Sequence, residues 1–143
     1  MIAVRDVENT DEFGGWWTSL EDFASRRVAA AINLLATHGP ALQFPHSSGI
    51  QGSRHTHMRE LRVQIGGKSL RIFYVFDPRR TAILLIGGDK TGKDRFYEEF
   101  VKLADELYQA TERLTRHHNV MARLDRAITP FVMLSLMARS SRP

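Results

Sequence analysis

The central topology of the chain follows from residues 61–86, which read LRVQIGGKSLRIFYVFDPRRTAILLI. Apolar side chains recur at every second position on both sides of Gly66-Gly67, and this period predicts a β-hairpin. A second turn at residues 77–80 leads into a third, almost entirely apolar strand that is expected to be buried on both faces. Three consecutive strands joined by short turns predict an antiparallel meander.

Two helical patterns precede this meander. Thr10 or Asp11 can cap a first helix, and a second helix is expected at residues 20–37. Gly39 and Pro40 follow the second helix in the order that is common after a helix end. The link between the helices is very short, so we expect them to form an antiparallel two-helix hairpin.

The remaining segments complete an α+β architecture. Residues 2–7 are predicted to form a short edge strand, residues 39–57 a long loop, and residues 93–112 a third helix. We therefore expect one domain at residues 1–112, with a short N-terminal strand, a two-helix hairpin, a three-stranded antiparallel meander and a C-terminal helix. Residues 113–143 are predicted to be a poorly ordered C-terminal extension.

Composition excludes several kinds of site. The 143 residues contain no cysteine, which excludes disulfides, thiolate metal sites and a cysteine nucleophile. His55 and His57 lack a nearby third ligand in the sequence, so no metal site and no cofactor are expected. No apolar run approaches the roughly 18 residues of a membrane span, and the start does not follow the order of a secretory signal. The sequence therefore predicts a cytoplasmic protein without a membrane partner.

Positive charge is concentrated in the centre of the chain. Residues 54–95 contain ten basic and four acidic residues, a net charge of +6, whereas the whole chain carries +4. A cationic surface of this kind suits an anionic partner such as a nucleic acid. A solvated face without any partner accounts for the charge equally well.

Two arginines of the hairpin are expected to lie close together. A four-residue turn at residues 66–69 would pair Ile65 with Leu70 and make Arg62 and Arg71 diagonal neighbours on the face opposite the helical hairpin. Both guanidinium groups could then reach one phosphate. Alternatively, a carboxylate could lie between them, and the candidates are Glu60, Glu98 and Asp89.

Further cations are expected at both ends of this sheet. Arg54, His55, His57 and Arg59 enter from the preceding loop, and Lys90 and Lys93 follow the third strand. Tyr97 lies on the first turn of the third helix, where it could either stack on a base or pack in the core. Cations beside an exposed aromatic ring are typical of surfaces that bind single-stranded RNA.

An ordered set of short motifs resembles the HigB-like, phage-related branch of the RelE/ParE toxin superfamily. The motifs include GPAL (39–42), GSRH (52–55), MRELR (58–62), RIFYVFDPRR (71–80) and IGGDK (86–90). The resemblance covers roughly residues 2–112 and implies a RelE-like fold whose outer sheet face meets RNA.

The resemblance also implies a function. Such a protein would be the toxin of a type II toxin–antitoxin module, an endoribonuclease that arrests translation by cleaving mRNA on the ribosome. Cleavage would need no metal, because the RNA 2′-hydroxyl attacks the adjacent phosphorus. The implied partners are mRNA, the ribosome and a cognate antitoxin, expected to be a helix-turn-helix protein. The alternatives are a non-catalytic toxin, such as a ParE-like gyrase inhibitor, and an inactive relative.

The motifs suggest a role for each candidate residue. Arg62 and Arg71 would clamp the phosphate, Lys90 would stabilise charge or transfer a proton, and Tyr97 would stack or relay a proton. The expected RNA contacts are Arg54, His55, His57, Arg59, Arg79, Arg80 and Lys93. No general base is identified.

Overall fold

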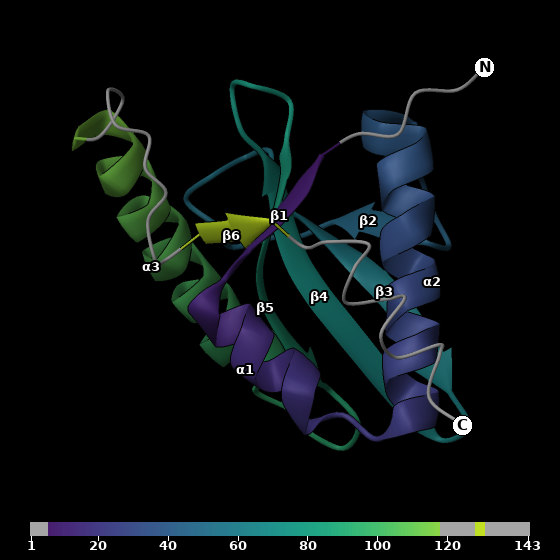
Figure 1. Ribbon diagram of the computed structural model, residues 1–143. Coiled ribbons are helices and arrows are strands. Elements are labelled where there is room, and N and C mark those ends of the chain that lie inside the picture. The colour runs from purple at the N-terminus through teal and green to yellow at the C-terminus, as the bar shows by residue number, and fades with distance from the viewer. Residues whose placement is uncertain (1–5, 118–127, 131–143) are drawn as a thin grey trace.

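A computed structural model of the chain describes residues 6–117 and 128–130. These residues form an α+β fold around one six-stranded sheet (Figure 1). The strands are β1 (Val7–Thr10), β2 (Ser47–Gly49), β3 (Arg59–Ile65), β4 (Lys68–Phe76), β5 (Ala82–Asp89) and β6 (Ile128–Pro130). The helices are α1 (Asp11–Ser19), α2 (Asp22–His38) and α3 (Phe96–His117), and a 3₁₀ turn spans Gly39–Ala41. The order of the strands across the sheet is β2-β3-β4-β5-β1-β6.

The predicted antiparallel meander is present as β3, β4 and β5. The predicted four-residue turn is wrong, because Ile65 pairs with Lys68 and only Gly66-Gly67 connects β3 to β4. Gly66 has a φ of 54°, a left-handed conformation that glycine adopts without steric cost and that allows the tighter turn. The register differs from the predicted one by two residues, so every side chain keeps its predicted face.

The N-terminal strand lies inside the sheet and not at its edge. Residues 2–5 of the strand predicted at residues 2–7 lie outside the described residues. The described strand β1 pairs in parallel with β5 and antiparallel with β6. This position is consistent with the apolar character of β5, which is buried on both faces and has partners along both edges. β2 was predicted as loop, and it pairs with the outer edge of β3.

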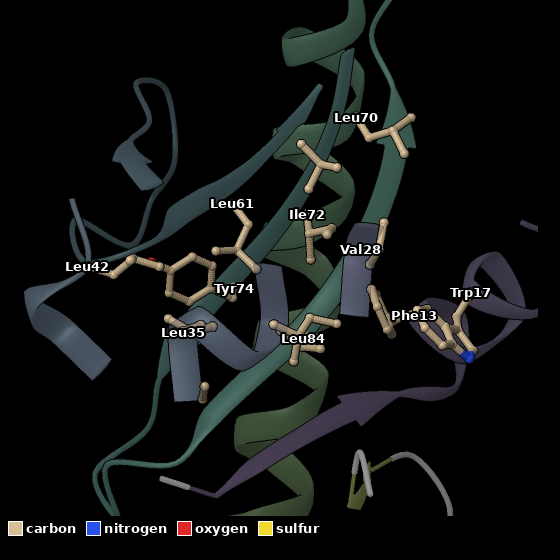
Figure 2. Close-up of a cluster of buried hydrophobic side chains, with 13 residues drawn as sticks. Phe13, Trp17, Val28, Leu35, Leu42, Leu61, Leu70, Ile72, Tyr74 and Leu84 are labelled. Carbon is tan, nitrogen blue, oxygen red and sulfur yellow. The ribbon is translucent and has the colours of Figure 1, made fainter. Parts of the chain in front are cut away.

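Helices cover both faces of the sheet. On one face, α1 packs mainly on β5 and α2 mainly on β3, so the predicted two-helix hairpin exists only as a short connection between helices that rest on different strands (Figure 1). Their apolar side chains meet those of the strands in a first core, part of which is drawn in Figure 2. This core includes Phe13, Trp17, Val28, Leu35, Leu61, Leu70, Ile72, Tyr74 and Leu84.

The opposite face, expected to be open for RNA, is largely covered by α3. A second core joins Phe73, Val75, Ile83 and Leu85 of the sheet to the apolar stripe of α3. Phe73 is fully buried there. The outer sheet face is therefore mostly an internal interface, and the expectation that it meets RNA as a whole is wrong.

β5 contains a β-bulge at Leu85. Leu85 is an extra residue between the pairs Phe73↔Ile86 and Tyr74↔Leu84, and its carbonyl accepts a 2.7 Å hydrogen bond from the Thr10 hydroxyl. The same hydroxyl accepts a hydrogen bond from the backbone N–H of Phe13 and caps α1. A single threonine thus joins the start of α1 to the bulge of β5.

The C-terminal part of the domain extends further than predicted. α3 ends at His117 and not at residue 112, and β6 belongs to the segment predicted as an extension. The prediction that residues 113–143 are poorly ordered concerns mainly residues outside the described ranges. Of the three helices described, none combines the length and the apolar character needed to cross a membrane.

Candidate functional site

The candidate site is centred on the Glu60 carboxylate of β3, which is 3% exposed. Arg62 Nη1 and Ser48 Oγ donate hydrogen bonds of 3.2 and 2.8 Å to Oε2. The Tyr97 hydroxyl donates a 2.7 Å hydrogen bond to Oε1, and Arg71 Nε lies 3.6 Å from the same atom. Strand alternation places Glu60 and Arg62 on one face, and the β3–β4 register brings Arg71 directly opposite Arg62.

Arg71 is buried and does not face solvent as expected. Its residue is 4% exposed, its Nη1 donates to the carbonyl of Leu70 at 2.9 Å, and its Nε donates to the Tyr97 hydroxyl at 3.2 Å. The expected open pair of guanidinium groups is therefore wrong for Arg71, because α3 covers this side chain. The alternative of a carboxylate between the two arginines is the observed one, and the carboxylate is Glu60.

Tyr97 packs against the second core, which is one of the two alternatives stated for it, and its hydroxyl binds Glu60. Its ring packs edge-on against Phe73 and Phe96, at centroid distances of 6.2 and 5.3 Å. Burial raises the pKa of the Tyr97 phenol, and the hydrogen bond to Glu60 raises it further against the opposing effect of Arg71. The phenol is therefore protonated at neutral pH and acts as a hydrogen-bond donor to the carboxylate.

Arg62 carries the accessible guanidinium of this network. Its side chain is 30% exposed, and its Cζ lies 5.1 Å from the centroid of the Phe44 ring. Phe44 itself is 70% exposed. The sequence predicts Phe44 only as an apolar anchor of the loop at residues 39–57, together with Leu42 and Ile50, and this prediction is wrong for Phe44 because its ring is exposed.

Lys90 lies directly after β5, at the same end of the sheet as the Gly66-Gly67 turn. Its Nζ is 5.6 Å from the centroid of the Tyr97 ring, and its backbone N–H donates to the carbonyl of Ser69. Lys93 is exposed in the following turn. The structure therefore brings together all four predicted catalytic residues, Arg62, Arg71, Lys90 and Tyr97, with Arg71 in a buried position.

The predicted RNA contacts in the loop before β3 lie elsewhere. The backbone N–H of Arg54 donates to Asp105, and the His55 ring meets the Tyr108 ring edge-on at 4.7 Å. His57 also lies beside Tyr108, with a centroid distance of 5.8 Å. Asp105 and Tyr108 lie about two and three turns along α3 from Tyr97. Arg54, His55 and His57 therefore form a group separate from the Glu60 site.

The remaining predicted contacts have structural partners or lie far from Glu60. Arg79 forms hydrogen bonds to Glu8 and Asp77, and these partners raise its pKa, with the Glu8 hydrogen bond as the largest cause. Arg80 is exposed in the same turn, at the end of β4 opposite the Gly66-Gly67 turn. Arg59 Nε donates to the Ser47 hydroxyl. Among residues 6–117 and 128–130, no three His, Asp or Glu side chains are grouped to hold a metal ion.

The fold and the site together define a small α+β domain in which a buried carboxylate–guanidinium network lies beneath one accessible arginine and a neighbouring lysine. The chain belongs to the family of phage-derived Gp49-like proteins (DUF891), whose sequence profile matches residues 15–109. This match includes Glu60, Arg62, Arg71, Lys90 and Tyr97.

Two relatives from Mycobacterium tuberculosis are named as toxins. The chain is 39% identical to "Putative toxin HigB2" over 108 residues, which is 74% of this chain and 54% of that protein. It is 41% identical to "Putative toxin HigB3" over 92 residues, which is 64% of this chain and 79% of that protein. The matched segment thus spans about half of the length of HigB2. The predicted resemblance to the HigB-like, phage-related branch is confirmed.

Proposed function

We propose that this chain is the toxin of a type II toxin–antitoxin module and that it cleaves mRNA on the translating ribosome. The observation that carries this proposal is the partly exposed guanidinium of Arg62, which is bound to Glu60. Glu60 also accepts a hydrogen bond from Tyr97, and the ammonium of Lys90 lies over the Tyr97 ring. Membership of a family that includes proteins named HigB toxins supports the same function.

The proposed reaction uses fixed positive charge. The RNA 2′-oxygen forms a bond to the adjacent phosphorus, and the bond from phosphorus to the 5′-oxygen of the next nucleotide breaks. A cyclic phosphate remains, and the 5′-oxygen takes up a proton from water to become a 5′-hydroxyl. Arg62 and Lys90 would stabilise the phosphorane, where negative charge is greatest. Arg71 would act as a positioning residue, because it holds Glu60 and Tyr97 and does not reach the surface.

The proton acceptor for the 2′-hydroxyl is expected to come from the ribosome. In the described part of the site, both oxygens of Glu60 are occupied by donors, and Tyr97 is a protonated phenol. A cationic site completed by ribosomal RNA fits this arrangement. The cognate antitoxin is proposed to present acidic residues to the same cations.

Induced expression in bacteria tests the function. We expect growth arrest with mRNA cleavage at codon-spaced positions inside translated regions, mapped by RNA end sequencing. Arg62→Ala should abolish both effects because it removes the accessible phosphate ligand. Arg26→Ala on α2 should leave both unchanged, because that arginine pairs only with Asp22 in the described structure and lies on the other face of the sheet. Growth arrest with intact mRNA would contradict the proposal.

The burial of Arg71 favours a second candidate, a toxin that binds its target without chemistry. The predicted phosphate clamp used the guanidinium groups of both Arg62 and Arg71. Because Arg71 is buried, only that of Arg62 is accessible. A gyrase inhibitor of this kind would induce the DNA-damage response while mRNA stays intact. A folded chain that causes no growth arrest would identify an inactive relative.

A further inference from the structure

Phe44 is exposed in a segment whose two large aliphatic residues are anchored. Leu42 is buried in the first core, and Ile50 packs against the second core. Of the large apolar side chains described, Phe44 and Phe23 are the two that are mostly exposed, at 70% and 56%. A single exposed apolar side chain is common at a protein surface, and what distinguishes Phe44 is its contact with Arg62.

The Phe44 ring is held in place by the candidate site itself. Arg62 Cζ lies 5.1 Å from the ring centroid, within the range of a cation–π contact. Arg62 is in turn bound to Glu60, which accepts a hydrogen bond from Ser48 on the neighbouring strand. The ring is thus connected to a buried network, whereas Phe23 is near the start of α2, on the other side of the sheet.

We propose that Phe44 is a stacking platform for an unpaired RNA base whose adjoining phosphate is bound by Arg62. This inference rests on the proposed action on RNA and adds a residue that contacts a base. An aromatic ring beside a guanidinium is the combination that receives a base and its phosphate together. The partly exposed guanidinium of Arg62 beside the ring suits an anionic partner such as RNA.

Binding of a short single-stranded RNA that contains 2-aminopurine tests this inference on the full-length chain. Phe44→Leu should weaken binding roughly tenfold, because the loss of one base–aromatic stack has an effect of about this size. Phe44→Tyr should stay within about twofold of the unaltered chain, since the aromatic ring is kept. Phe23→Leu is the matched control and should bind like the unaltered chain. Fluorescence quenching of 2-aminopurine should accompany Phe or Tyr at position 44 and not Leu.

The possible results separate the two proposals. If the unaltered chain binds RNA and Phe44→Leu binds equally well with the same quenching, the stacking inference is overturned while the proposed function stands. If the unaltered chain binds no RNA, the stacking inference is overturned, whereas the proposed function, which depends on the ribosome, is decided by the mRNA cleavage test. If Phe44→Leu lowers the affinity for the antitoxin and leaves RNA binding unchanged, the ring is a protein contact and the inference is again overturned. Thermal unfolding of each variant verifies that the fold is intact.

Discussion

Glu60 joins three strands and one helix through one carboxylate. It lies on β3, accepts hydrogen bonds from Ser48 on β2 and Tyr97 on α3, and pairs with Arg71 on β4. Removing a carboxylate from water is costly, and here the cost is offset because two guanidinium groups and two hydroxyls surround the charge. The same network fixes the arginine that is proposed to bind phosphate.

Glu60→Gln should lower the free energy of unfolding by about 3 kcal/mol, because it leaves the buried Arg71 without its countercharge. Urea denaturation measures this loss. Glu98→Gln is the control, since the Glu98–Arg95 pair is exposed on both sides and its loss should not change stability measurably.

A double variant separates the charge effect from simple loss of packing. Glu60→Gln combined with Arg71→Met should recover a large part of the lost stability, because no unpaired charge then stays buried. If Glu60→Gln is as stable as the Glu98 control, the carboxylate does not bind Arg71 in solution.

Strand alternation was sufficient to predict most of this residue cluster. It predicted Arg62 and Arg71 as diagonal neighbours on one face, with Glu60 among three carboxylates that could lie between them, whereas the observed register places the two arginines directly opposite each other. The exposure of Arg71 could not be predicted, because it depends on how α3 packs on the sheet. Phe44 was predicted as a loop anchor and not as a site residue, because its contact with the site follows from the position of Arg62.

Two consecutive glycines let α1 and α3 approach β5 from opposite sides. A Cβ atom on Gly87 would lie 2.3 Å from the Trp16 ring, and one on Gly88 would lie 2.6 Å from the Phe100 ring. Neither ring can move away easily, because each is packed against a core. The absence of side chains at these positions is therefore a condition for both helix contacts.

Gly87→Ala should lower the free energy of unfolding by about 1–3 kcal/mol, because the added methyl group must displace the indole of Trp16. Gly67→Ala is the matched control, since a Cβ there meets nothing within 4 Å. Thermal unfolding compares the two variants. An equal effect of both substitutions would show that Trp16 does not approach β5 as closely as described.

Periodicity predicted the long strands and helices better than the short ones. β3, β4 and the first two helices carry clear patterns of two or 3.6 residues, whereas β2 and β6 are three residues long and have no recognisable alternation. The turn length was wrong because it depends on the backbone conformation of Gly66, which a pattern of side chains does not reveal.

The cations of the whole molecule form separate groups in three dimensions. Arg62 lies in the middle of β3 and Lys90 follows the end of β5, whereas Arg79 is bound to Glu8 and Asp77 beyond the far end of β4. The net charge of the central segment therefore overstates the charge that one ligand can meet. We expect RNA to contact the Arg62 side and not the Arg79 side.

The salt dependence of RNA binding should reflect this division. The logarithm of the affinity should fall linearly with the logarithm of the salt concentration, and Lys90→Gln should reduce the slope by about 0.7 if that ammonium meets one phosphate. Arg79→Gln should leave the slope unchanged, because Arg79 is already paired with carboxylates. Fluorescence anisotropy at several salt concentrations measures both slopes, and a larger change for Arg79→Gln would contradict the assignment.

The parallel pairing of β1 with β5 also bears on how the protein is made. Val7 pairs with Ala82, so β1 can pair with β5 only after more than half of the sequence has been synthesised. A nascent chain that stops before β5 leaves Phe13 and Trp17 without the strand that they cover. Incomplete translation products therefore cannot assemble the Arg62 surface in its finished form, and a harmful activity would arise only after the ribosome has passed β5.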